Sequence, residues 1–324
     1  MKLLHVLALF AGFAFSASLT PAIIPVLKRF KFGQEIRKEG NETHYKKQGT
    51  PTMGGIVFVP VIVILGILFS LFFPEEAPLE KVLPVMLLTL AFGVIGFADD
   101  FLKIKKHQSE GFNPLQKLLC QIAVSVGFAA YCYFTPSIGS EVIMPFTGGK
   151  VWNMGWLYFP FVLIVLLGTD NGTNLTDGID GLLASVTTVV AFFLTILGLR
   201  TGSGIAVPCL VSAGALLGYL IYNANPAKLF MGDTGSLALG GLVAGAALVS
   251  KSGWFILLFG FIYVIEVVSD ILQVAFFKLT HGKRIFKMAP IHHHFEKCGL
   301  TEVQVVWLFT GVTILAAVLS YAAM

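Results

Sequence analysis

Long apolar stretches recur along this 324-residue chain, and they restrict its fold more than any other feature. Most hold roughly 17 to 24 residues, which is enough for a helix to cross the hydrocarbon of a bilayer. Backbone groups inside a membrane must bond within their own segment, so these stretches predict helices rather than open sheets. We expect ten spans, at about 3–27, 52–73, 82–98, 116–134, 156–170, 181–199, 205–222, 234–250, 254–276 and 303–322.

The composition is that of a polytopic membrane protein, because 56% of the residues are hydrophobic and only 12% are charged. The polar connections between the predicted spans are too short to form a separate soluble domain. The sequence therefore predicts an all-α fold with one integral-membrane domain over residues 1–324.

The uneven distribution of Lys and Arg predicts the orientation. Of the 22 such residues, 17 fall in the connections 28–51, 99–117, 223–233 and 277–301, and five fall on the other side. Positively charged connections stay in the cytoplasm, so these four should be cytoplasmic and both termini should lie outside. The net charge of +4 reflects this asymmetry, and no patch typical of nucleic-acid binding is present.

The most unusual polar segment is the run DNGTNLTDGIDG from Asp170 to Gly181. On a helix, Asp170, Asn174 and Asp177 would fall within about 60° of one another and point at one ligand. The glycines in the run favour a partly unwound segment that allows close backbone approach. The alternative is a solvated loop, but so many carboxylates and amides at a membrane boundary favour ligand binding.

Two further carboxylate positions border apolar runs on the predicted cytoplasmic side. Asp99 and Asp100 follow an uncharged run, and Asp233 precedes one. Adjacent carboxylates repel unless a cation compensates, and their hard oxygen atoms suit Mg²⁺. The Asp99-Asp100 pair alone could simply mark the membrane boundary, and Asp233 could be a helix N-cap, a role compatible with metal binding.

Basic side chains on the same side could bind phosphate. Lys47 precedes the segment TPTMGG, which contains Thr52, and Lys117 lies among leucines near the start of the fourth predicted span. Any single lysine could serve membrane orientation alone. Lys117 is the less ordinary one, because apolar residues flank it.

Three consecutive histidines form another polar group. They lack the spacing of zinc ligands, so we interpret them as binding phosphate or carboxylate. In the ninth predicted span, Glu266, Asp270 and Gln273 share one helix face, which either lines a cavity or bonds to neighbouring helices. The three histidines are His292, His293 and His294.

Together these motifs resemble a known family. The Asp99-Asp100 pair, the run from Asp170 to Gly181, and the stretch from Asn223 through Phe230 to Asp233 are similar to the polyprenyl-phosphate N-acetylhexosamine-1-phosphate transferases. The segments APIHHHFE at 289–296 and TPTMGG at 50–55 resemble the phospho-N-acetylmuramoyl-pentapeptide transferase branch of that superfamily. The similarity spans essentially the whole chain.

The resemblance implies a ten-helix enzyme of the bacterial inner membrane, usually a homodimer, with periplasmic termini and an active-site cleft facing the cytoplasm. Such an enzyme would transfer phospho-N-acetylmuramoyl-pentapeptide from UDP to undecaprenyl phosphate, release UMP and require Mg²⁺. This reaction gives the first lipid-linked intermediate of peptidoglycan, on which cell-wall biogenesis, cell shape and cell division depend.

The resemblance also implies roles for individual residues. Asp99, Asp100 and Asp233 match catalytic carboxylates and metal ligands of the family. The positions that match its substrate-binding residues are Lys47, Thr52, Lys117, Asn174, Asp177, Asp180, Asn223, Phe230, His292, His293 and His294.

Two mechanisms are compatible with these residues. In the first, the lipid phosphate attacks directly, Asp99 acts as the base, and Asp100 orients Lys117 or the metal. In the second, an aspartate acts as the nucleophile in two steps.

Two other classes of protein compete with this interpretation. A transporter would place its charges near the midplane of the membrane and contain repeated halves, neither of which the sequence indicates. A sister transferase that uses UDP-N-acetylglucosamine would share the Asp motifs, but the histidine triplet argues against it.

Overall fold

The computed structural model describes residues 3–29, 49–106 and 111–324, most of which are helical. The helices are α1 (Leu3–Arg29), α2 (Gly55–Phe72), α3 (Leu79–Lys106), α4 (Pro114–Phe134), α5 (Tyr158–Thr176), α6 (Leu182–Thr201), α7 (Ala206–Asn223), α8 (Gly232–Val249), α9 (Ile256–Phe259), α10 (Phe261–Leu279), α11 (Ile291–Lys297) and α12 (Glu302–Ala322). A two-stranded antiparallel hairpin, β1 (Glu141–Ile143) and β2 (Val151–Asn153), follows α4 in the chain.

Within the described ranges, eight helices are long and apolar enough to cross a membrane: α1, α2, α3, α4, α6, α7, α8 and α12. A ninth candidate is the segment Gly253–Phe259 together with α10, which are bent by 81° at the break between them. α5 fills the fifth predicted span but does not qualify, because polar residues from Thr169 to Thr176 make up its last two turns. The mostly helical membrane fold is confirmed, whereas the count of ten spans is not.

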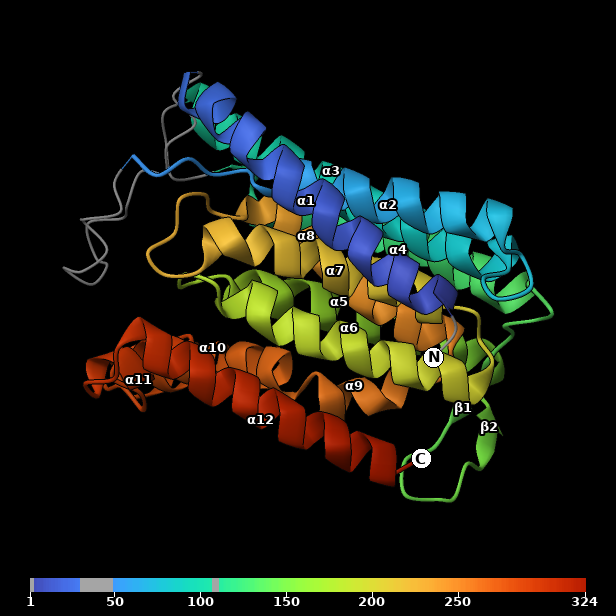
Figure 1. The fold of residues 1–324 in the computed structure, drawn as a ribbon. Coiled ribbons are helices and arrows are strands. Elements are labelled where there is room, and N and C mark those ends of the chain that lie inside the picture. The colour runs from blue at the N-terminus through green and yellow to red at the C-terminus, as the bar shows by residue number, and fades with distance from the viewer. Residues whose placement is uncertain (1–2, 30–48, 107–110) are drawn as a thin grey trace.

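The helices run side by side, and the two ends of the bundle differ. Figure 1 shows the N- and C-terminal ends of the chain near the β1–β2 hairpin, while α11 and the connection from α7 to α8 lie at the opposite end. Both chain ends thus lie at the same end of the bundle, which is the arrangement that an even number of spans produces.

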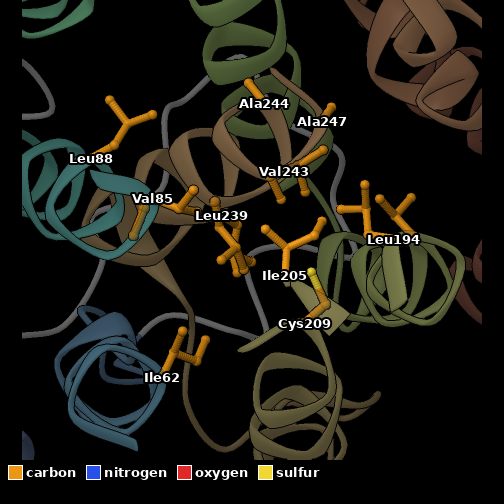
Figure 2. Close-up of a cluster of buried hydrophobic side chains, with 14 of the residues drawn as sticks. Ile62, Val85, Leu88, Leu194, Ile205, Cys209, Leu239, Val243, Ala244 and Ala247 are labelled. Atoms are coloured by element: carbon orange, nitrogen blue, oxygen red, sulfur yellow. The ribbon is translucent and has the colours of Figure 1, made fainter. Parts of the chain in front are cut away.

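The central helix of the bundle is α8, which contacts α2, α3, α5 and α6. In the most apolar stretch of 18 residues in each helix, 89% of the residues are buried for α8, but only 22% for α1 and for α12. The inner helices are therefore surrounded by protein and the outer helices face lipid. Figure 2 shows part of this core, where α8 meets α2, α3, α6 and α7 through side chains that include Ile62, Val85, Leu194, Cys209, Leu239 and Val243.

The crossing of α3 and α8 positions the candidate site. Gly96 of α3 lies directly against the backbone of Asp233 in α8, and a Cβ at Gly96 would overlap the carbonyl group there. Because no side chain separates the two backbones, the helices approach very closely. Asp99 and Asp100 lie one turn beyond Gly96 on the same side of α3, so the contact brings them to the start of α8.

Candidate active site

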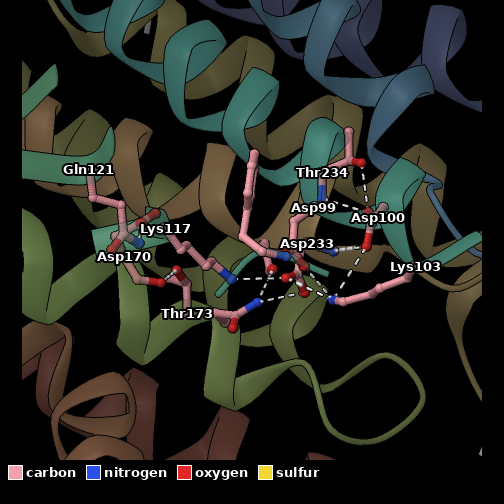
Figure 3. Close-up of polar contacts among 12 residues, drawn as sticks. Asp99, Asp100, Lys103, Lys117, Gln121, Asp170, Thr173, Asp233 and Thr234 are labelled. Carbon is pink, nitrogen blue, oxygen red and sulfur yellow. Dashed lines mark hydrogen bonds and ion pairs between the residues drawn. The ribbon is translucent and has the colours of Figure 1, made fainter. Parts of the chain in front are cut away.

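Three carboxylates from distant parts of the chain meet at the end of the bundle that carries α11. Asp99 and Asp100 lie inside α3, which continues as a helix to Lys106 instead of ending at residue 98, and Asp233 lies in the first turn of α8. One oxygen atom of each carboxylate lies within 4.8 Å of the other two (Figure 3). Asp99 and Asp100 are only 3% and 4% exposed. The predicted carboxylate positions therefore form one cluster.

Asp100 binds the start of α8. Its Oδ2 accepts hydrogen bonds from the backbone N–H of Thr234 at 2.9 Å and from the Thr234 hydroxyl at 2.7 Å. Its Oδ1 accepts from the N–H of Asp233 at 3.2 Å. The first N–H groups of a helix lack partners within the helix, so a carboxylate from α3 supplies them here. Asp100 consequently fixes the position of Asp233.

Two lysines lie inside the carboxylate cluster. The Nζ atom of Lys103 is 2.6 Å from Asp99 Oδ2 and 3.0 Å from Asp233 Oδ2, and Lys117 Nζ is 2.8 Å from the same Asp233 oxygen. Lys117 thus pairs with Asp233 rather than with Asp100. Lys103 was not predicted from the sequence, although its spacing of four residues from Asp99 on one helix is the signal that could have identified it.

The donor atoms in this cluster could hold a divalent cation. Three carboxylates face two ammonium groups, so one negative charge is uncompensated when all of them are ionised. Carboxylate oxygens are the ligands that Mg²⁺ prefers, and a cation would relieve their mutual repulsion. The chemistry of the donor set therefore fits the predicted metal, with Asp233 at its centre.

Of the two α5 residues predicted to face one ligand, Asp170 and Asn174, only Asn174 reaches the cluster. The Asn174 amide donates to Asp233 Oδ1 at 3.0 Å and to the Ser236 hydroxyl at 2.9 Å. Asp170 lies one turn earlier, fully buried, and accepts from the Gln121 amide of α4 at 2.5 Å. α5 is helical as far as Thr176, so the expected unwinding is confined to the short connection that follows.

The connection from α5 to α6 carries Asp177 and Asp180. Burial raises the pKa of Asp177 well above its usual range, and the neighbouring carboxylates of Asp233 and Asp100 raise it further. The Asp180 carboxylate accepts from the N–H of Ala227 at 2.9 Å. Asp180 thereby ties this connection to the one between α7 and α8.

The connection from α7 to α8 is also bound to the segment that precedes α2. The N–H of Phe230 donates to the Pro51 carbonyl at 2.8 Å. Thr52 lies beside Gly232, because a Cβ added to this glycine would be 3.0 Å from the Thr52 hydroxyl oxygen. The buried Asn223 amide donates to the Leu229 carbonyl at 2.9 Å. Lys47 lies outside the described residues.

The three histidines have different partners. His292 Nδ1 is 3.0 and 3.1 Å from the two carboxylate oxygens of Glu266, and both side chains are fully buried. His293 Nδ1 is 2.7 Å from a carboxylate oxygen of Glu296, and His294 Nδ1 accepts from a backbone N–H at 3.1 Å. The three rings are therefore not equivalent and do not form a single set of ligands. The partner of His292, Glu266, comes from the polar face of α10.

His292 is the histidine that reaches the α5–α6 connection. A Cβ at Gly178 would overlap His292 Nε2, so the ring lies directly against this glycine. Within the part of the chain that the structure describes, this Nε2 atom is buried and has no hydrogen-bond partner. Gly178 therefore brings the imidazole within contact of the segment that holds Asp177 and Asp180.

Comparison with known proteins agrees with the geometry of this site. The family described as "Glycosyl transferase family 4" matches residues 82–251, and "Phospho-N-acetylmuramoyl-pentapeptide-transferase signature 1" matches residues 47–59. Curated relatives named phospho-N-acetylmuramoyl-pentapeptide-transferase match nearly the whole chain. The one from Clostridium botulinum (strain Alaska E43 / Type E3) is 46% identical over 318 residues, which cover 98% of this chain and 95% of the relative.

Two other relatives of the same name are similar to the chain to the same degree. The one from Acetivibrio thermocellus is 45% identical over 99% of this chain and 95% of its own length. The one from Clostridium perfringens (strain 13 / Type A) is 45% identical over 98% of both chains. The resemblance predicted from the motifs is confirmed, and the chain belongs to the phospho-N-acetylmuramoyl-pentapeptide-transferase family of enzymes.

Proposed function

We propose that this enzyme transfers phospho-N-acetylmuramoyl-pentapeptide from UDP-N-acetylmuramoyl-pentapeptide to undecaprenyl phosphate, with Mg²⁺ as cofactor. The products are UMP and the first lipid-linked intermediate of peptidoglycan. The proposal depends above all on the cluster of Asp99, Asp100 and Asp233, which contains Lys103 and Lys117. A transfer between two anionic phosphates needs cations to bring them together, and this cluster provides two lysines and carboxylates that can bind a metal.

The reaction is a single displacement. An oxygen of undecaprenyl phosphate attacks the phosphorus attached to the sugar, and the bond from that phosphorus to the bridging oxygen of UMP breaks. Asp99 takes the proton of the lipid phosphate. Lys103 and Lys117 offset the negative charge of the reacting phosphates. Mg²⁺ bound at Asp233 and its neighbouring carboxylates would neutralise further charge on the leaving UMP.

The competing mechanism uses an aspartate as the nucleophile and leaves a phosphosugar attached to the protein. In the structure both oxygens of Asp100 accept hydrogen bonds from α8, and the two oxygens of Asp99 are bound by the Phe112 N–H and by Lys103, which disfavours either aspartate as the nucleophile. Incubating the protein with the UDP-sugar in the absence of lipid distinguishes the two mechanisms. A phosphosugar adduct detected by mass spectrometry would overturn the direct displacement.

The nucleotide sugar binds along the connections that surround the cluster. The supporting contacts are those that link the α5–α6 connection, the α7–α8 connection and the segment before α2. His292 contacts the first of these through Gly178. The binding residues in this proposal are Lys47, Thr52, Lys117, Asn174, Asp177, Asp180, Asn223, Phe230, His292, His293 and His294.

In the membrane, α5 and the bent α9–α10 pair complete ten crossings. The connection-rich end, with most of the lysines and arginines, faces the cytoplasm of a bacterial inner membrane, and the termini are periplasmic. The chain acts as one integral-membrane domain, and two copies form a homodimer.

The decisive test of the reaction compares two nucleotide sugars. Purified protein with undecaprenyl phosphate and Mg²⁺ should release UMP from UDP-N-acetylmuramoyl-pentapeptide and not from UDP-N-acetylglucosamine. UMP release from UDP-N-acetylglucosamine alone would assign the chain to the sister reaction instead. Omission of Mg²⁺ with added chelator should stop the release of UMP.

Replacing Glu266 by Gln should raise the KM for the UDP-sugar about tenfold, because an amide would present one acceptor oxygen to His292 Nδ1 where the carboxylate presents two, and the ring would be less firmly oriented. The change keeps the size and burial of the side chain, so kcat and the melting temperature should change little. The matched control is Asp270→Asn, four residues further along α10, whose carboxylate forms no hydrogen bond with the triplet among the described residues. Equal KM values for the two variants would contradict an orienting role for Glu266.

A further inference from the structure

A second group of cations surrounds a cavity at the other end of the bundle, near the chain termini. The cavity has a volume of about 410 Å³ and lies between the start of α3 and the ends of α6 and α8. Lys81, Arg200 and Lys251 line it, together with Ser137 and Ser203. No aspartate or glutamate among the described residues lines it.

Positive charge is scarce at this end of the bundle, and most of it is gathered around the cavity. The sequence places few lysines and arginines there, and those that the structure describes are Lys81, Lys150, Arg200 and Lys251. Three of these four line one cavity. Membrane orientation favours the removal of positive charge from this side, so it does not explain the grouping.

The cations are only partly compensated. Lys251 Nζ is 2.6 Å from Glu141, which lies outside the cavity lining. Arg200 donates to the Tyr321 carbonyl at 3.2 Å, and its guanidinium lies 4.9 Å from the centre of the Tyr321 ring. This contact fixes the guanidinium and uses one of its five N–H donors. Met324, whose terminal carboxylate is anionic, also lines the cavity, but neither Lys81 nor Arg200 forms an ion pair with a carboxylate among the described residues, so the cavity keeps a positive charge and several donors.

Two further observations point to a ligand. The Ser137 hydroxyl oxygen is buried and, within the described part of the chain, has no hydrogen-bond partner. Lys251 has a φ of +59°, a left-handed backbone conformation in which glycine is the usual residue after a helix. A lysine at this position costs conformational energy, which is expected where the side chain has a function.

We propose that this cavity binds a phosphate group, either in the headgroup of an anionic phospholipid or as a free phosphate ion. Arg200 would bind two phosphate oxygens through its paired N–H donors, and Lys81 and Lys251 would add point charges. The Ser137 hydroxyl would donate to a further oxygen. Because the ends of a transmembrane bundle lie at the level of lipid headgroups, a phosphate is present in the membrane at this depth.

The test is a binding measurement on the purified full-length protein. Phosphatidylglycerol is titrated and the bound lipid is measured by native mass spectrometry, for the wild type and for a Lys81→Ala/Arg200→Ala double variant. The double variant should bind at least about tenfold more weakly, because two charged donors are lost. The matched control is Lys150→Ala, which removes a cation from the same end but outside the cavity lining, and it should bind like the wild type.

A second arm uses inorganic phosphate as competitor. If phosphate displaces the lipid, the cavity binds free phosphate as well, and if it does not, the headgroup is the ligand; both results support the site. The Ser137→Asp variant keeps all three cations and should also weaken lipid binding. UMP release, which depends on the site at the other end of the bundle, shows whether each variant is folded. Lipid binding by the double variant or by Ser137→Asp that equals that of the wild type would overturn the proposal.

Discussion

Replacing Asp233 by Asn should lower UMP release by about a thousandfold, the largest effect that we expect from any single change. Asp233 is the residue on which Lys103, Lys117 and Asn174 converge, at 2.8 to 3.0 Å. Loss of its charge would leave both lysines without their common partner and remove the carboxylate that we propose as the central metal ligand. The fold should persist, because Asp100 binds the backbone of α8 whatever the side chain at 233.

The measurement is UMP release at saturating Mg²⁺ and both substrates, together with the melting temperature. The control is Glu75→Gln, an exposed carboxylate in the connection between α2 and α3 at the other end of the bundle, which should leave the rate unchanged. Activity of Asp233→Asn within tenfold of the wild type would exclude Asp233 from the reaction.

Gly96→Ala should lower UMP release by about a hundredfold without changing any charged group, because it would move apart the carboxylates that we propose to be catalytic. An alanine Cβ at this position overlaps the backbone of Asp233, and a backbone cannot move aside as a flexible side chain can. α3 and α8 would separate at the point where Asp99 and Asp100 face Asp233. We also expect a loss of about 1–3 kcal/mol of stability from overpacking.

The control for this change is Gly127→Ala in α4, where the added Cβ would meet no atom of another helix within 4 Å in the part of the chain that the structure describes. Alanine is the better helix former, so this variant should be as stable as the wild type or slightly more stable, with normal activity. The comparison removes any general effect of replacing a glycine in a helix. Normal activity of Gly96→Ala would show that the site does not depend on the close contact between α3 and α8.

Much of the fold follows from hydropathy alone. The apolar stretches predicted the long helices, because a backbone in lipid has few alternatives to a helix. The predicted membrane spans stop short of the helix ends where polar residues continue the helix: α3 continues through Asp99 and Asp100 to Lys106, and α5 continues through Asp170 to Thr176. Helix ends in such regions depend on partners from other helices, such as Gln121 for Asp170, which hydropathy does not report.

The sequence predicted the carboxylates of the candidate site, but it did not predict Lys103 or the partners of His292. Asp99, Asp100 and Asp233 border apolar runs, where an unpaired charge is costly, so their position alone is informative. Lys103 appeared to be one of many lysines on that side of the membrane. The partner of His292 is Glu266, 26 residues away, and the contact of its ring with Gly178 depends on how α10 and α11 pack against α5. No local sequence pattern predicts such contacts.

The burial of α8 has a consequence for how this sequence can change. α8 is built largely from glycine, alanine and other small residues and is enclosed by its neighbours, so a larger side chain at almost any position meets another helix. Most residues of α1 and α12 are not enclosed by other helices of this chain, so side chains of many shapes can be accommodated there. A scan of all single substitutions, scored by growth of cells that rely on this copy, would find α8 the least permissive membrane segment. Drift among descendants of this protein would accumulate in α1 and α12 first.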